Sequence, residues 1–170
     1  MAIRPILVLP DPRLRAVADP IEVVDDEVRA LAKDMLDTMY DAPGVGLAAP
    51  QIGVMKRIVV MDLAKEGETP EPLVMINPEI LSVSEDTVIT EEGCLSIPEL
   101  FYDVERAADL TVQYTDLDGN DVTREAGDRL SVCIQHELDH LDGVLYIDYL
   151  SRLKRDRVLK KFQKAARRTA

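Results

Sequence analysis

The first third of the chain carries apolar residues at helical spacing. From Asp25 onward they recur at i, i+3, i+4 and i+7, the period of a helix with one buried face. The positions are Val28, Leu31, Ala32, Met35, Leu36, Met39 and Tyr40. Asp25 and Asp26 suit the start of this helix, and Pro43-Gly44 ends it. The pattern therefore predicts an amphipathic helix over residues 25–40.

The middle of the chain has the pattern of strands joined by turns. Apolar runs predict strands at 57–63, 73–83 and 88–97, and the Glu-, Gly- and Pro-rich segment 65–72 reads as a surface loop. Leu110, Val112 and Tyr114 then alternate with polar residues before Leu117-Asp118-Gly119-Asn120, a hairpin turn signal. This part of the chain is therefore expected to form antiparallel sheet.

Two further helices are expected near the end of the chain. Residues 128–141, followed by Gly143, have apolar side chains around most of the circumference, which indicates a largely buried helix. Residues 151–168 carry only a thin apolar stripe: Leu153, Val158, Leu159, Phe162 and Ala166. With no repeat or linker, the order predicts a single domain over 1–170 of the α+β class. Antiparallel strands would pack around a buried central helix, flanked by an N-terminal and a C-terminal helix.

Composition agrees with this picture. The chain has 170 residues, of which 46% are hydrophobic and 31% charged, as in an ordinary globular protein. No apolar run approaches the roughly 20 residues that cross a bilayer, and the N-terminus lacks a secretory pattern. Two cysteines argue against a disulfide framework. We therefore expect a cytoplasmic protein with no membrane partner.

Charge is distributed unevenly along the chain. The net charge of −12 argues against general nucleic-acid binding. Residues 152–168, however, hold nine Lys or Arg and one acid, Asp156, so this segment carries +8 and the rest of the chain −20. A solvated helix face accounts for such a basic segment as readily as a partner of opposite charge does.

The candidate chemistry lies in the central helix, at His136-Glu137-Leu138-Asp139-His140. Histidines at i and i+4 share one helix face, so both can bind one metal ion. Glu137 is rotated about 100° from His136, which places it beside the metal as an acid–base group rather than a ligand. A chance HExxH on an exposed helix is the alternative. The buried character of this helix argues against it, because two histidines and a glutamate are costly there without a function.

The third protein ligand must be Cys, Asp or Glu, because the chain has no other histidine. No Glu follows Glu137, and Tyr146 stands where a longer zinc-protease motif has its third histidine. Both protease patterns therefore lack their third ligand. An aspartate such as Asp148 could still complete a metallopeptidase site, so that alternative stays open.

The two cysteines differ in their reach. Cys133 lies about 10.5 Å along the helix axis from His140, too far for a shared metal with a sulfur bond of about 2.3 Å. It reads as a buried apolar residue. Cys94 with His136 and His140 would leave one position open for water, the pattern of a catalytic site. A closed site using both cysteines, in a metal-stabilised binding module, is the non-catalytic alternative.

The chain resembles the bacterial-type peptide deformylases. Three segments match the three motifs of that family in order and at compatible spacing: Gly44-Val45-Gly46-Leu47-Ala48-Ala49-Pro50-Gln51, Glu92-Gly93-Cys94-Leu95-Ser96 and Gln135-His136-Glu137-Leu138-Asp139-His140. The likeness covers nearly the whole chain. It implies removal of the N-formyl group from the N-terminal formyl-methionine of new polypeptides, with release of formate.

The resemblance also implies roles for particular residues. Cys94, His136 and His140 would bind the metal, and Glu137 would carry the proton. The Gln51 side chain and the Leu95 backbone N–H would stabilise the oxyanion. The peptide would pair with the backbone near Val45-Gly46. Val132 and Cys133, on the turn before His136, are expected to line an apolar methionine pocket.

Three further expectations concern the metal, the partner and the pocket. One thiolate and two imidazoles suit Fe²⁺, Zn²⁺, Co²⁺ or Ni²⁺. The resemblance implies Fe²⁺ in the cell, commonly replaced by Zn²⁺ or Ni²⁺ in purified protein. It also implies that the basic C-terminal helix docks on the ribosome. Phe101 and Arg129 depart from the family pattern, at positions where some relatives have a peptide-binding Arg and an apolar pocket residue.

Overall fold

The computed structural model describes residues 2–169, with Thr169 described only as part of its helix. Met1 and Ala170, which belong to the predicted domain of 1–170, lie outside the described residues. The helices are α1 (Asp26–Asp41), α2 (Asp128–Leu141) and α3 (Arg152–Thr169). The strands are β1 (Gly46–Ala48), β2 (Ile58–Met61), β3 (Leu73–Val83), β4 (Thr87–Cys94), β5 (Ile97–Ala107), β6 (Asp109–Thr115) and β7 (Asp121–Gly127). Three 3₁₀ turns complete the order: η1 (Pro12–Arg15), η2 (Ala49–Ile52) and η3 (Tyr146–Tyr149).

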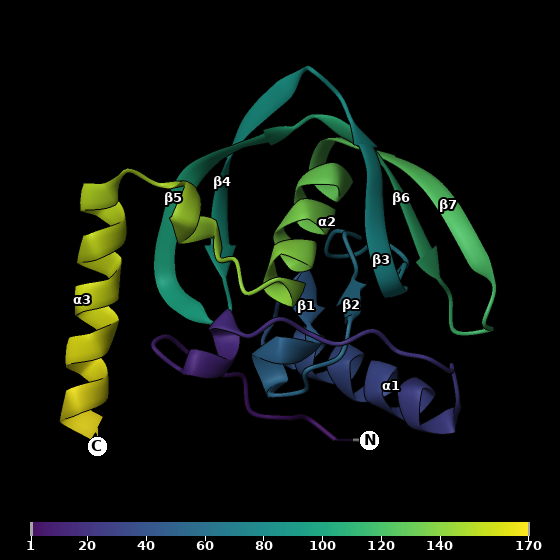
Figure 1. The fold of residues 1–170 in the computed structure, drawn as a ribbon, viewed down its shortest axis with the longest axis horizontal. Coiled ribbons are helices and arrows are strands. Elements are labelled where there is room, and N and C mark those ends of the chain that lie inside the picture. Colours follow the sequence, from purple (N-terminus) through teal and green to yellow (C-terminus); the bar gives the residue numbers. More distant parts are fainter. Residues whose placement is uncertain (1, 170) are drawn as a thin grey trace.

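Helix α2 lies at the centre of the molecule, between two antiparallel sheets (Figure 1). One sheet has five strands in the order β1-β2-β3-β6-β7, and the other is the β4–β5 hairpin. Ile134, Leu138 and Leu141 of α2 pack against the five-stranded sheet, where Val59 and Val112 belong to the same buried cluster. The predicted α+β fold around a buried central helix is therefore confirmed.

Helix α1 covers the end of the five-stranded sheet next to β1 and β2 (Figure 1). The Asp25 side chain accepts a hydrogen bond of 3.0 Å from the Val28 N–H, which caps the first turn. The predicted buried stripe is confirmed at most positions, from Val28 to Met39. Two positions differ: Leu36 is half-buried, and Tyr40 is 45% exposed, with its hydroxyl donating to Asp62. Tyrosine has an apolar ring and a polar hydroxyl, so it is suited to a position at the surface.

The strand predicted over 88–97 is confirmed as β4 up to Cys94 but runs too far, and the next strand, β5, was not predicted. Strand β4 ends at Cys94, the chain turns at Leu95-Ser96, and β5 begins at Ile97. A bulge between Glu92 and Cys94 precedes this turn. Pro98 and the polar residues after it hide β5 from a search for apolar runs. The predicted strand over 73–83 coincides with β3.

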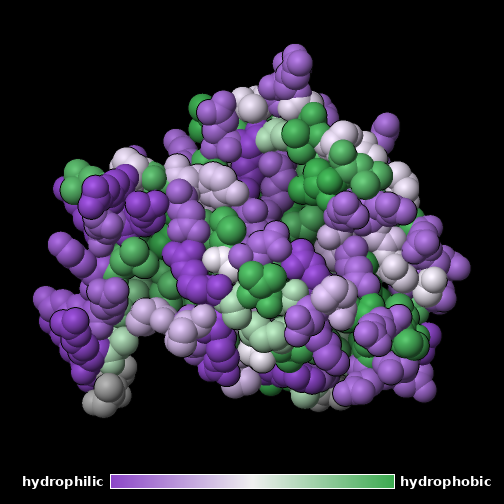
Figure 2. All heavy atoms as spheres, viewed as in Figure 1, coloured by the Kyte–Doolittle hydropathy of each residue, from purple (hydrophilic) through white to green (hydrophobic). Residues whose placement is uncertain are grey.

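Helix α3 stands at the edge of the molecule (Figure 1), and most of its residues are exposed. Val158 and Phe162 are buried in a cluster with Leu14 and Ile97. Leu153, predicted as part of the same stripe, is 63% exposed, because five residues of helix rotate it about 140° from Val158. Hydrophilic side chains cover the outer side of this helix (Figure 2, left). Within residues 2–169, no helix combines the length and apolar character needed to cross a membrane.

Candidate active site

Helix α2 places two histidines one turn apart on its buried face. The ring centroids of His136 and His140 lie 5.1 Å apart, and both side chains are buried. The ring of Tyr146 stacks on that of His136 at a centroid distance of 6.0 Å. The i, i+4 spacing thus aims both imidazoles at one region, as helical geometry requires.

Cys94 approaches these histidines from the β4–β5 sheet. Its position at the end of β4, just after the bulge, puts Sγ 3.3 Å from Nε2 of His140. One donor atom each from Cys94, His136 and His140 lie within 4.8 Å of one another. Segments 42 and more residues apart in the chain therefore converge on one point.

The side chains present fit a divalent metal ion. One sulfur and two imidazole nitrogens form a donor set that such ions accept, with a further position left for water or substrate. Nδ1 of His140 is buried and has no hydrogen-bond partner among the described residues. Nδ1 of His136 lies 2.9 Å from Oε1 of Glu92. With that carboxylate ionised, Nδ1 carries the proton and Nε2 keeps its lone pair for a metal.

The two alternative metal ligands, Asp148 and Cys133, do not join the donor cluster. Asp148 instead pairs with Arg15 at 2.6 Å and accepts from the Leu145 N–H. Cys133 is not part of the three-residue donor cluster, and burial raises the pKa of its thiol well above the usual value. A buried neutral thiol is a poor metal ligand. Neither the aspartate site nor the closed two-cysteine site is therefore supported.

Glu137 is a buried carboxyl group without a full set of partners. Burial raises its pKa to about 7. Its Oε2 atom has no hydrogen-bond partner among the described residues, and its Oε1 lies 4.0 Å from Nε2 of His136. A carboxyl group with such a pKa, beside the donor cluster, can both accept and return a proton near neutral pH.

Gln51 points its amide nitrogen at the same cluster. Its Oε1 accepts a hydrogen bond of 2.9 Å from the Ala48 N–H, which fixes the orientation of the amide. Its Nε2 then donates to Ser96 Oγ at 3.1 Å and lies 3.6 Å from Cys94 Sγ. Turn η2, which follows β1 directly, holds this side chain fully buried.

A cavity of about 640 Å³ opens in front of the site. Its walls include Glu137, Gln51, Cys94, Leu95 and His136. The four residues predicted to bind substrate also line it: Val45, Gly46, Val132 and Cys133. Phe101 and Arg129 lie in its wall as well, and both are exposed, so they stand at its mouth.

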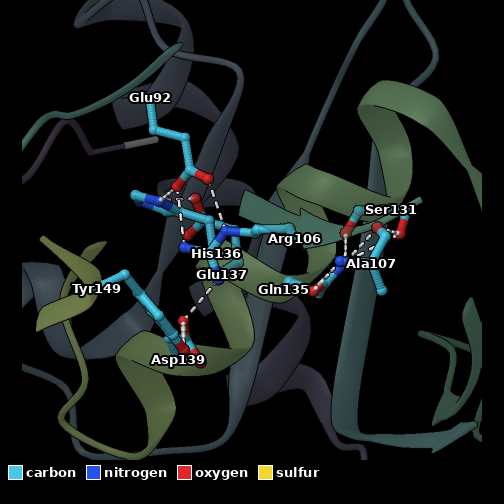
Figure 3. Close-up of polar contacts among 9 residues, drawn as sticks. All are labelled: Glu92, Arg106, Ala107, Ser131, Gln135, His136, Glu137, Asp139 and Tyr149. Carbon is cyan, nitrogen blue, oxygen red and sulfur yellow. Dashed lines mark hydrogen bonds and ion pairs between the residues drawn. The ribbon is translucent and has the colours of Figure 1, made fainter. Parts of the chain in front are cut away.

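Sequence reasoning missed a buried network next to the site. Arg106 forms ion pairs with Glu92 and Asp139, and Tyr149 donates to Asp139 (Figure 3). Hydrogen bonds from His136 and Arg106 lower the pKa of Glu92 against the opposing effect of burial. Glu92 stands in the second matching segment, but its partner lies on the unpredicted strand β5. Arg106 lies two residues after Val104 and therefore shares the buried face of β5. A charged side chain at such a position was the available sign of a buried ion pair.

The chain is similar to known proteins over nearly its full length. The sequence profile of the family described as "Polypeptide deformylase" matches residues 3–156. A peptide deformylase of Agrobacterium fabrum is 61% identical over 98% of both chains. The crystal structure of a peptide deformylase from Legionella pneumophila is 46% identical, covers 99% of this chain and 98% of its own, and superposes with a TM-score of 0.89. A peptide deformylase from Ehrlichia chaffeensis, crystallised in complex with actinonin, is 41% identical over 97% of this chain and 98% of its own, with a TM-score of 0.91.

Proposed function

The chain belongs to the polypeptide deformylase family, and on that premise we propose which residues carry its reaction. The reaction is removal of the N-formyl group from the N-terminal formyl-methionine of newly made polypeptides, with release of formate. One observation supports the assignment of residues most directly: the donor atoms of Cys94, His136 and His140 converge beside a cavity that the buried Glu137 also lines.

Cys94, His136 and His140 would hold the metal ion on which the family depends. A bound divalent metal lowers the pKa of a water molecule and polarises the formyl oxygen. The mixed sulfur and nitrogen donors accept Fe²⁺, Zn²⁺, Co²⁺ or Ni²⁺. We assign Fe²⁺ in the cell and expect Zn²⁺, Ni²⁺ or Co²⁺ to replace it in purified protein. Metal analysis of protein purified without oxygen tests this assignment.

Glu137 is the proposed general base and acid. Its carboxylate takes the proton of the attacking water and later gives it to the departing amine. A pKa of about 7, caused by burial, suits both steps. Because Oε2 has no hydrogen-bond partner among the described residues, it is free to hold that proton.

Gln51 and Leu95 are the proposed oxyanion donors. Negative charge develops on the formyl oxygen as water attacks, and donors already aimed at that oxygen need no rearrangement. Ala48 and Ser96 hold the Gln51 amide so that its Nε2 faces the cluster. The Leu95 N–H follows Cys94 directly in the chain, at the wall of the same cavity.

The substrate would bind in the cavity as an extended chain. Strand β1 forms one edge of the five-stranded sheet, so its free side can pair with the peptide near Val45-Gly46. Val132 and Cys133 supply part of an apolar wall for the methionine side chain. A preference for peptides that begin with a formylated charged residue would contradict this assignment.

We also propose that α3 binds the ribosome and that the protein works in the cytoplasm, where new chains emerge. The helix buries Val158 and Phe162 and leaves most of its basic side chains exposed. Such a surface attracts phosphate groups without reading sequence. The acidic remainder of the chain would repel them, which limits contact to this helix.

Formate release from a formyl-Met peptide tests the proposal. We expect formate from the protein as purified, none after the metal is removed with a chelator, and recovery after Fe²⁺ or Co²⁺ is restored. The same peptide without a formyl group is the control and should stay intact. Cleavage of its internal peptide bonds would instead indicate a metallopeptidase.

A further inference from the structure

Arg106 is an almost fully buried arginine on β5 that contacts two carboxylates. It is 5% exposed. Its Nε donates to Oε2 of Glu92 at 2.6 Å, and its Nη2 donates to Oε1 of the same carboxylate at 2.9 Å. The third nitrogen, Nη1, donates to Oδ2 of Asp139 at 2.9 Å. Figure 3 shows the guanidinium between the two carboxylates. This paired geometry fixes the plane of the Glu92 carboxylate as well as its position.

The same carboxylate contacts a proposed metal ligand. Oε1 of Glu92, which accepts from Arg106, also lies 2.9 Å from Nδ1 of His136. A carboxylate bonded to the far nitrogen of a ligating imidazole sets its tautomer and its orientation. Without the guanidinium, Glu92 would be a buried charge with the histidine as its main partner, and its carboxylate could rotate. Arg106 therefore controls the group that orients His136.

The other side of the guanidinium is held from α2 and η3. Asp139 lies between His136 and His140 on α2, and its Oδ2 also accepts from the Tyr149 hydroxyl at 2.9 Å. The Tyr149 ring lies against the guanidinium, with Cζ of Arg106 4.8 Å from the ring centroid. The Arg106 side chain is thus fixed on both sides and can act as a rigid support.

We propose that Arg106 is a positioning residue for the metal centre: it holds Glu92 so that His136 presents Nε2 to the metal. Arg106 is not among the residues that line the substrate cavity, so it acts through Glu92 and not on the substrate. The inference rests on the proposed metal role of Cys94, His136 and His140.

The alternative is that Arg106 only holds β5 and α2 together and has no effect on the metal ligand. A second arginine that contacts α2, Arg57, serves as the control that distinguishes these two roles. Arg57 also braces α2: its Nη1 donates to the Leu141 carbonyl at 3.1 Å and to Asp142 at 3.0 Å. It has no contact with Glu92 or the donor cluster among the described interactions. Arg57→Lys therefore alters a contact that holds the same helix, α2, and leaves the proposed ligand His136 and its partner Glu92 unchanged.

The experiment loads the full chain with Co²⁺ and measures three properties of R106K, E92Q, the double variant and R57K. These are the visible absorption of the Co²⁺–thiolate site, the rate of Co²⁺ loss to excess chelator, and kcat and KM for a formyl-Met peptide. Lysine keeps the charge but cannot form the paired contact. We expect R106K and E92Q each to speed Co²⁺ loss about 10- to 100-fold, because loss of such a ligand partner typically lowers metal affinity by that factor. The absorption should change and kcat should fall, with KM nearly constant.

The double variant tests whether Arg106 acts through Glu92. If it does, R106K should add less than about twofold to the Co²⁺ loss of E92Q, because residues that act on one target are not additive. R57K should stay within about twofold of the wild type. Additive effects in the double variant, or a wild-type rate of Co²⁺ loss in R106K, would overturn the proposal.

Three further outcomes bear on the proposal. If R106K does not fold, the double variant R106Q/E92Q removes both buried charges together, and a wild-type rate of Co²⁺ loss from that variant overturns the proposal. A wild-type chain that takes up no Co²⁺ would overturn the metal site and the inference together. If the wild type binds Co²⁺ normally and R106K loses Co²⁺ at the wild-type rate, the inference about Arg106 is overturned and the metal site stands.

Discussion

Gly46 lies directly against the carboxylate of Glu137. A Cβ atom placed on Gly46 would stand 2.7 Å from Oε1 of Glu137 and 3.1 Å from Sγ of Cys133. Gly46→Ala should therefore push the Glu137 carboxylate away from the donor cluster. We expect kcat for a formyl-Met peptide to fall about 10- to 100-fold, because a misplacement of about 1 Å can cost about 100-fold in rate.

The control for this variant is Gly127→Ala. A Cβ there would meet Oδ1 of Asp109 at 2.6 Å, but this is the end of a flexible surface side chain that can move aside. Its kcat should equal that of the wild type. Equal kcat values for Gly46→Ala and Gly127→Ala would show that the close approach of Gly46 does not position Glu137.

Glu137→Gln should keep the metal and the fold and nearly abolish turnover. The amide has the same shape but cannot carry the proton, and general acid–base catalysis contributes about 10²- to 10⁴-fold. Formate release and bound metal are measured on the same sample. The exposed Glu85→Gln, on the turn between β3 and β4, is the control and should be fully active. More than about a tenth of normal kcat in the Glu137 variant would contradict its role.

Phe162→Ala should destabilise the protein through the packing of α3. Phe162 is 7% exposed in the cluster that also holds Leu14 and Ile97, and loss of a buried Phe costs about 3 kcal/mol or more. Leu153→Ala, on the same helix but 63% exposed, should change the free energy of unfolding by less than about 0.5 kcal/mol. Urea unfolding of both variants measures the difference. Similar losses of unfolding free energy in the two variants would show that Phe162 does not pack α3 against the rest of the protein.

Reversal of charge on α3 should weaken ribosome binding. Removing the whole helix would uncover the cluster around Phe162, so substitution of exposed lysines is the cleaner change. Lys160, Lys161 and Lys164 replaced together by Glu should lose at least about 10-fold in affinity at low salt, with activity on free peptides kept. Cosedimentation with ribosomes at two salt concentrations measures this.

A control with the same change in net charge separates a local effect from a general one. Lys33, Lys65 and Arg124 are exposed basic residues on other parts of the chain. Their joint replacement by Glu should leave ribosome cosedimentation nearly unchanged. Equal loss of binding in both triple variants would assign the effect to net charge and remove the special role of α3.

The sequence by itself determined the features that depend on local spacing. The i, i+4 interval puts His136 and His140 on one face of α2, with Glu137 beside them, wherever that helix packs. The fixed rise of a helix likewise separates Cys133 from His140 and leaves Cys94 as the better ligand. The three matching segments identified the family, which the comparisons confirm. Most helix boundaries followed from the same periodicity, including α1 and α2.

Tertiary structure decided the contacts between residues far apart in the chain. The Cys94–His140, Glu92–His136 and Gln51–Ser96 pairs join segments 44 to 46 residues apart. No periodic pattern encodes such distances, because they depend on how the β4–β5 hairpin folds back and where it meets α2. Strand β5 was missed and the strand before it was extended to Ile97, since Pro98 and polar neighbours interrupt the apolar pattern of β5. The role of Arg106 became visible only in the structure, because it depends on β5 facing α2, where two carboxylates offset the cost of burying its charge.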